Sequence, residues 1–90
     1  MSFFFVFTAY SCQKSGEDYF GSDIRRDVVN NWLECQKRCQ SMDECAYWTY
    51  DTNGNACYTK YAAAGNNLRK AGSHTTTGPK YCNGKHNTKC

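Results

Sequence analysis

The sequence predicts a small α+β domain that is held together by disulfide bonds and places one helix on an antiparallel sheet. Seven cysteines and fourteen aromatic residues stand in a chain of 90 residues that has only eleven Leu, Ile, Val and Phe residues. One stretch repeats apolar residues at helical spacing, and two β-rich stretches flank a turn signal. A chain of this size buries little apolar surface, so it needs covalent links, and disulfides form in oxidising compartments.

Residues 1–11 are predicted to form an apolar strand. Alternate residues of a strand point to opposite faces, and both sets are apolar here, so something must cover both faces. Two interpretations stay open: a central strand of the chain's own sheet, or a strand docked on a neighbouring copy. We expect a structural segment rather than a secretory leader, because no basic residue precedes Lys14. The candidate self-association residues are Phe3, Phe4, Phe5, Val6 and Phe7.

A helix is predicted near residues 32–42. Four residues of this stretch recur at helical spacing and therefore share one face. Asn31 can cap the start, and Glu34 follows three residues later as its reciprocal partner. The four residues on the shared face are Trp32, Cys35, Cys39 and Met42.

A β-hairpin is predicted after the helix. Residues 45–50 form a β-rich run, residues 51–54 are a turn signal, and residues 56–60 form the return strand. After the hairpin we expect a loop at residues 62–73 and a strand at 74–77. A turn at 78–79 and a polar tail at 83–90 follow.

The cysteines suggest a disulfide framework with one residue left over. Six cysteines can pair in many ways, and sequence alone does not choose among them. Cys35 and Cys39 lie one helical turn apart, so each faces a partner elsewhere rather than the other. Cys39 can reach Cys45 just after the helix, and Cys35 can then reach Cys57 on the return strand.

The remaining cysteines lie towards the two ends of the chain. Cys12 and Cys82 would tie the ends of the domain together, whereas Cys90 is odd and lies outside the framework. An odd cysteine in a secreted chain indicates either an intermolecular bridge or a free thiol, and both interpretations stay open for Cys90.

Several motifs follow one another in a recognisable order. They are the opening Tyr19-Phe20-Gly21-Ser22-Asp23-Ile24, the spacing Cys35-x3-Cys39-x5-Cys45, the aromatic run Ala46-Tyr47-Trp48-Thr49-Tyr50, the strand around Cys57, and the close Gly78-Pro79-Lys80-Tyr81-Cys82. With these motifs the chain, over about residues 12–82, resembles a PAN/apple domain of the short type. The apolar strand before this region and the tail that ends in Cys90 depart from the family's pattern.

The resemblance implies both a fold and a general function. It implies a curved antiparallel sheet that cradles one helix, and the bridges Cys35–Cys57, Cys39–Cys45 and Cys12–Cys82. Members of this family are extracellular, non-enzymatic modules that bind proteins or carbohydrates. We therefore divide the chain into an N-terminal strand at 1–11, a PAN/apple-like domain at 12–82 and a tail at 83–90.

No pattern in the sequence indicates catalysis, a metal or a cofactor. A zinc site needs closer Cys and His pairs, and a catalytic thiol needs a base beside it, which Cys90 lacks in its polar tail. Neither a phosphate-binding loop nor a basic helix for nucleic acid is present. We expect no membrane-spanning helix either, because no apolar run approaches about 18 residues.

Charge is distributed unevenly along the chain. Residues 1–51 carry five basic and eight acidic residues, whereas residues 52–90 carry six basic residues and no acidic one. The basic half is either a solvated surface or a surface that attracts acidic glycans or the acidic half of another copy. Tyrosines between the basic residues either pack or stack on sugars. The candidate ligand-binding residues are Lys60, Tyr61, Arg69, Lys70 and Tyr81.

The sequence therefore predicts a secreted, extracellular interaction protein without enzymatic activity. The first interpretation is a structural subunit that self-associates through its N-terminal strand into a fibre or surface assembly, as a homo-oligomer or polymer. The alternative is a monomeric, lectin-like module that binds protein or acidic or neutral glycans. Nucleic acid is not expected as a partner.

Overall fold

The computed structural model of the chain describes residues 12–82, which form one α-helix and seven strands. The strands are β1 (Lys14–Ser15), β2 (Glu17–Tyr19), β3 (Asp23–Val28), β4 (Tyr47–Asp51), β5 (Ala56–Lys60), β6 (Leu68–Lys70) and β7 (Thr75–Pro79), and the helix is α1 (Trp32–Gln40). The predictions for the strand at 1–11 and the tail at 83–90 lie outside the described residues.

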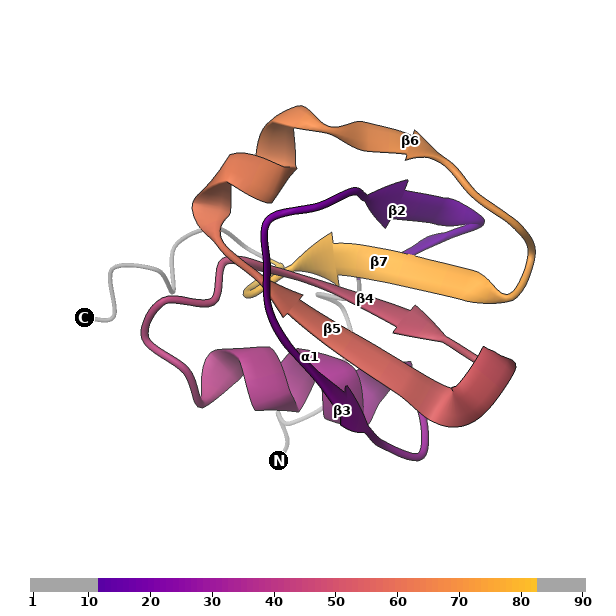
Figure 1. The fold of residues 1–90 in the computed structure, drawn as a ribbon, viewed down its shortest axis with the longest axis horizontal. Coiled ribbons are helices and arrows are strands. Elements are labelled where there is room, and N and C mark those ends of the chain that lie inside the picture. The colour runs from indigo at the N-terminus through magenta and orange to yellow at the C-terminus, as the bar shows by residue number, and fades with distance from the viewer. Residues whose placement is uncertain (1–11, 83–90) are drawn as a thin grey trace, which may run out of the picture.

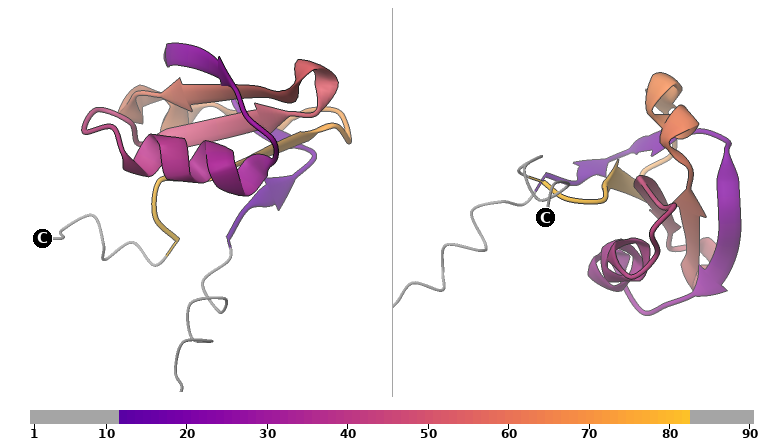
Figure 2. Two further views of the ribbon diagram at one scale, coloured as in Figure 1. Left: turned by 90° about the horizontal axis from the view of Figure 1, so that it is seen from below. Right: turned by 90° about the vertical axis from the view of Figure 1, so that its left-hand side faces the viewer.

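The strands form one larger sheet and one separate ribbon, all with antiparallel pairing. The larger sheet has the order β1-β7-β4-β5-β3, and β2 pairs only with β6. Figure 2 shows α1 along one face of the sheet, and Figure 1 shows the β2–β6 ribbon beside β7. The central strand of the described sheet is β4, which contacts the helix, the ribbon and two neighbouring strands.

The helix begins as the sequence predicted. The Asn31 side chain accepts a hydrogen bond from the Glu34 backbone N–H at 2.9 Å, which satisfies one of the free donors of the first turn. The Glu34 carboxylate accepts from the N–H of Asn30, one residue earlier than a standard capping box. The helix ends at Gln40 rather than near residue 42, because the Ser41 N–H closes the last turn on the carbonyls of residues 37 and 38.

The hydrophobic core lies between α1 and the sheet. The ring of Trp32 stacks on that of Trp48, with centroids 5.8 Å apart and planes 9° apart. Because Trp48 is 1% exposed, this stack fixes the helix on the central strand. The buried residues of the cluster are Val29, Cys35, Cys39, Cys45, Trp48, Tyr50 and Cys57.

Three disulfides hold the fold, in the same pairs that the resemblance implied. Cys35–Cys57 and Cys39–Cys45 fasten the helix to β5 and to the loop before β4, and all four of these residues are buried. Cys12–Cys82 joins the two ends of the described region, whose Cα atoms lie 5.4 Å apart. Its sequence separation of 70 residues makes its entropic contribution the largest of the three, about 4 kcal/mol.

Four strands, β1, β2, β3 and β6, were not predicted from the sequence. Four of the six residues of β3 are charged, because it is an edge strand whose side chains largely remain in water, so it lacks the alternation of a half-buried strand. β6 lies within residues 62–73, which were predicted as a loop; its residues are all exposed, and it is held only by β2.

The predicted turn at residues 78–79 is instead the end of β7. Gly78 lies in the strand because the ring of Trp48 covers it, and a Cβ at this position would lie 2.9 Å from Trp48 Cζ2. The Pro79 carbonyl accepts a hydrogen bond from Trp48 Nε1 at 2.9 Å. The requirement for Gly78 is therefore steric and comes from a neighbouring strand, not from a turn.

Candidate functional site

The two faces of the sheet carry different side chains. On β4, Trp48 and Tyr50 belong to the core on the helix side, whereas Thr49 and Asp51 point to the opposite face. Tyr58 on β5 pairs with Thr49 and shares that face. The face away from the helix is therefore largely polar.

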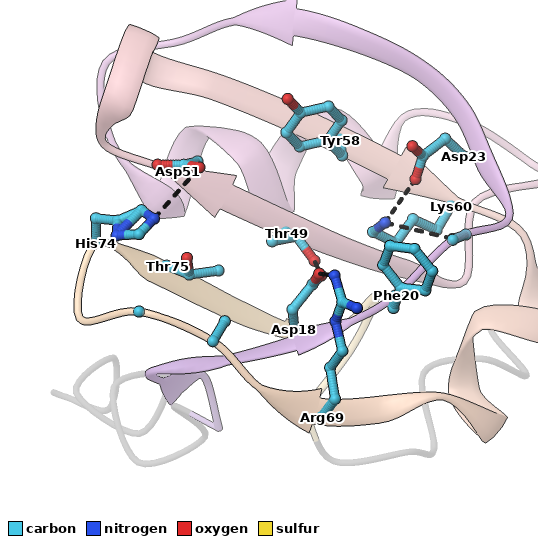
Figure 3. A pocket seen from close by; sticks show the side chains of 13 residues that line it. Asp18, Phe20, Asp23, Thr49, Asp51, Tyr58, Lys60, Arg69, His74 and Thr75 are labelled. Carbon is cyan, nitrogen blue, oxygen red and sulfur yellow. Dashed lines mark hydrogen bonds and ion pairs between the residues drawn. The ribbon is translucent and has the colours of Figure 1, made fainter.

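A groove with a volume of about 420 Å³ lies on this polar face, between the sheet and the β2–β6 ribbon. Figure 3 shows Thr49 near its middle, with Tyr58 to one side and Asp18 to the other. Asp51 and His74 lie at one end, and Phe20, Asp23 and Lys60 lie at the other.

Buried hydroxyl groups attach the ribbon to the sheet. Thr49 Oγ1 donates to Asp18 Oδ1 at 2.7 Å, and it lies 2.8 Å from Thr77 Oγ1. Thr77 Oγ1 also donates to the Trp48 carbonyl and accepts from the Tyr19 N–H. Thr49 and Thr77 are 4% and 0% exposed, so these bonds are buried or partly buried and hold β2 and one wall of the groove in a fixed position.

One basic side chain of the groove is buried with an acidic partner. Lys60 Nζ lies 2.5 Å from Asp23 Oδ1 and donates to the Gly21 carbonyl at 3.3 Å. The Lys60 side chain is only 4% exposed, whereas that of Asp23 is 47% exposed. A buried ammonium group needs such partners, so the main role of Lys60 is within the fold.

The other two basic side chains are more exposed, and each also faces an aspartate. Arg69 Nη2 lies 3.6 Å from Asp18 Oδ2, and His74 Nε2 lies 3.8 Å from Asp51 Oδ2. Pairs of this length and exposure contribute little to stability. Their consequence is electrostatic, because the Arg69 guanidinium stands beside the Asp18 carboxylate and the His74 imidazole beside that of Asp51.

Two aromatic rings belong to the groove. Phe20 is 50% exposed, and the Arg69 guanidinium carbon lies 3.6 Å from the centroid of its ring. Tyr58 has Lys60 Nζ at 5.7 Å and Arg26 Cζ at 5.9 Å from its ring centroid. Phe20 is therefore the more accessible apolar surface for a ligand.

Several polar atoms at the groove have no hydrogen-bond partner among residues 12–82. They include the Tyr58 hydroxyl, the Thr75 hydroxyl and the second carboxylate oxygen of Asp23. Thr75 is 5% exposed and nevertheless lines the groove. A polar ligand could use these atoms without breaking a bond of the fold.

Tyr19 supports the groove from the ribbon side. Burial raises the pKa of the Tyr19 hydroxyl above its usual value of 10.0, and the neighbouring Tyr47 and Glu17 raise it further. The rings of Tyr19 and Tyr47 lie with their centroids 4.4 Å apart. The neutral form of Tyr19 is therefore part of the packing between ribbon and sheet.

The structure brings together some of the predicted ligand residues and separates others. Lys60 and Arg69 both line the groove. Tyr61 is exposed outside it, and Lys70 lies on β6 opposite Glu17. Tyr81 lies at a second hollow, and the self-association residues and Cys90 lie outside the described residues.

Sequence reasoning missed the acidic side of the groove. Asp18, Asp51 and His74 were not among the predicted ligand residues, although all three line it. The uneven charge distribution was the available signal, since the aspartates come from the acidic half and their basic partners from the other half. The halves neutralise each other within one domain, so charge lends less support to association between copies than the sequence suggested.

A second hollow of about 450 Å³ lies near the end of β7. It is lined by Gln40, Asp43, Tyr47, Lys80 and Tyr81, among others. Lys80 Nζ donates to the Met42 carbonyl at 2.8 Å, and Gln40 Nε2 donates to the Lys80 carbonyl at 3.0 Å. Much of its polar lining is thus engaged in holding the helix end to the last strand.

Neither a metal centre nor a membrane-spanning helix is found among the described residues. Among residues 12–82, no three His, Cys, Asp or Glu side chains are grouped in a way that would hold a metal ion. Over the same described range, the one α-helix is too short and too polar to span a bilayer.

Comparisons with known proteins agree on the fold. A family model described as PAN domain matches residues 17–67, more than half of the chain. The solution structure of the two N-terminal apple domains of Toxoplasma gondii microneme protein 4 matches with a TM-score of 0.68 and 24% identity, which confirms the predicted fold. The match covers 77% of this chain and 44% of that one, and no curated protein matches significantly.

Proposed function

This chain belongs to the PAN domain family, and on that premise we propose that it is an extracellular, non-enzymatic module that binds a carbohydrate in the groove described above. PAN and apple domains are known for binding proteins or carbohydrates in extracellular proteins. Three disulfides in a domain this small favour an oxidising compartment.

The observation that carries this proposal is an exposed aromatic ring in the same groove as unpaired hydrogen-bonding atoms. Phe20 offers an apolar surface at one end of the groove, and the hydroxyls of Tyr58 and Thr75 have no hydrogen-bond partner among the described residues. Sugars present apolar C–H faces together with many hydroxyl groups, so they suit a site with both features. A few oriented polar groups with an aromatic surface are typical of small-ligand sites.

The test uses isothermal titration of the full chain with soluble oligosaccharides. We expect Phe20→Ala to weaken binding at least about tenfold, because the ligand loses its apolar contact. Leu33→Ala is the matched control, since Leu33 is similarly exposed, at 46%, but lies on α1 away from the groove. Equal losses in the two variants, or no binding by the unmodified chain, would reject the groove as the site.

Self-association remains a second candidate function. The bond between Cys12 and Cys82 means that residues 1–11 and 83–90 join the domain at one place, and neither cysteine lines the groove. An assembly formed through Phe3–Phe7, with Cys90 as an intermolecular bridge, would therefore be compatible with ligand binding. Both segments are apolar or cysteine-bearing additions to the family's minimal domain.

Sedimentation velocity tests this candidate. We expect the full chain to form oligomers or polymers, and the variant without residues 1–11 to be monomeric. Cys90→Ser should remove only the part of the assembly that survives denaturant without a reductant. A full chain that stays monomeric at high concentration contradicts the candidate and leaves the groove proposal intact.

A further inference from the structure

The charge of the groove differs from the charge of the chain. The whole chain has a formal net charge of +3 with histidines neutral. The groove, however, has three aspartates against Lys60 and Arg69, which leaves it one negative charge on the same count. If Arg26, whose guanidinium lies near the Tyr58 ring, is counted as well, the net formal charge of the groove rises to zero and no higher. The groove therefore has no net positive charge, although the chain as a whole does.

Hydrogen-bonding capacity points in the same direction. Lys60 donates to Asp23 and to the Gly21 carbonyl, whereas Arg69 and His74 each face an aspartate without a hydrogen bond to it. The atoms left for a ligand are carboxylate oxygens, hydroxyls that both donate and accept, and guanidinium N–H groups that stand beside Asp18. Such a groove favours a ligand that can both donate and accept hydrogen bonds, as an uncharged sugar hydroxyl does.

Anionic ligands meet the opposite situation. A carboxylate or sulfate only accepts hydrogen bonds, so it gains nothing from Asp51 or Asp23. If it approached Arg69, the most exposed base of the groove, it would stand next to Asp18, whose carboxylate lies 3.6 Å from that guanidinium. Repulsion between like charges at such distances opposes binding.

We propose that the groove selects uncharged, hydroxyl-rich ligands and rejects glycans that carry carboxylate or sulfate groups, although the chain as a whole is basic. This inference rests on the proposed function and makes its ligand class specific. Within it, Asp51 is the main specificity-determining residue. One of its carboxylate oxygens accepts from the Asn53 N–H, whereas the other has only His74, at 3.8 Å.

Cationic ligands could also donate to the aspartates, but the groove already holds positive groups near its aromatic side. Lys60 and Arg26 both lie within 6 Å of the centre of the Tyr58 ring, at 5.7 and 5.9 Å. An ammonium or guanidinium ligand would be repelled there. A basic peptide is therefore the less favoured ligand, and it serves as one arm of the test.

The experiment measures the affinity of the full chain for neutral oligosaccharides of hexose and N-acetylhexosamine, and for the same oligosaccharides bearing a sulfate or a uronic acid. We expect the neutral forms to bind at least about tenfold more tightly. Their affinity should change by less than about twofold between about 0.05 M and about 0.5 M NaCl, because no net charge is neutralised.

Two variants in the groove and one control outside it sharpen the result. Asp51→Asn keeps the acceptor for the Asn53 N–H, but it should weaken binding of neutral oligosaccharides about tenfold and reduce the discrimination against anionic ones. Asp43→Asn makes the same change of charge in an exposed loop outside the groove and should change neither quantity. Tyr58→Phe removes a single hydroxyl and should weaken neutral binding without altering the discrimination.

The outcomes separate this inference from the proposed function. Binding that favours the sulfated or uronic forms and weakens with salt overturns the inference alone, as does tighter binding of a lysine-rich peptide in the groove. An equal response of Asp51→Asn and Asp43→Asn also overturns it. If no oligosaccharide binds, the proposed function fails and the inference fails with it.

Discussion

The two faces of the sheet are stabilised by different kinds of interaction. The helix side is apolar and cross-linked, with Trp48 and Tyr50 packed among buried disulfides. The groove side is held by hydrogen bonds such as the one between Thr49 and Asp18. Stability and the proposed ligand binding are therefore largely separated in this domain, because one face supplies the core and the other leaves polar atoms available.

The strongest test of this separation is removal of a large core side chain. Trp48→Ala should lower the free energy of unfolding by about 3–5 kcal/mol, because it empties the space between α1 and β4. Denaturant unfolding followed by circular dichroism measures the change. Phe20→Ala, on the other face, should change stability by less than about 0.5 kcal/mol. Comparable losses in the two variants would mean that the faces are not separate.

A smaller effect is expected where the β2–β6 ribbon joins the groove side of the sheet. Thr49→Val keeps the shape of the side chain but removes the hydroxyl that donates to Asp18, so about 1–3 kcal/mol of stability should be lost. Ligand affinity should also fall, because the wall carried by β2 is no longer fixed. Amide hydrogen exchange should report faster exchange in β2 and β6 than in α1. Uniform acceleration across the domain would contradict this explanation.

The helix cap should contribute less than the core. Asn31→Ala removes the acceptor for the Glu34 N–H and should cost about 1 kcal/mol, as measured by thermal or chemical unfolding. Asn31→Asp is the control, since Asp also caps and suits the positive end of the helix dipole. Ligand affinity should be the same in both variants, because α1 lies on the other face of the sheet from the groove.

The smallest effect concerns alkaline pH. Because burial raises the pKa of Tyr19 in the folded state, the unfolded chain loses this proton at a lower pH than the folded chain. The contribution is therefore fully present below about pH 10 and is lost as the pH rises towards the folded-state pKa. Unfolding at several alkaline pH values should show a shallower decline in Tyr19→Phe, and an identical decline would contradict the assignment.

Much of the core could be predicted from the sequence, because its signals are local. The spacing of Trp32, Cys35 and Cys39 indicated the helix face, and the run at 45–50 indicated a strand, which the structure places at the centre of the described sheet. The limited number of apolar residues left few alternatives for a core. The resemblance to the family then implied the three disulfide pairs that the structure contains.

The groove was less predictable, because its residues are brought together by tertiary contacts. Asp18 and Arg69 meet through the pairing of β2 with β6, and β6 itself gave no sequence signal. His74 and Asp51 likewise come together only in the folded structure, through strand pairing that composition does not reveal. Lys60 was predicted as a surface ligand residue, but its burial with Asp23 depends on the unpredicted strand β3.

The bond between Cys12 and Cys82 also has a mechanical meaning. Tension applied to the chain on either side of the domain would pass through this covalent link, whose Cα atoms are 5.4 Å apart, rather than through the strands and helix between them. The enclosed residues would carry almost none of the load. A domain closed by this bond keeps its groove intact under a pulling force that would unfold a domain without the bond.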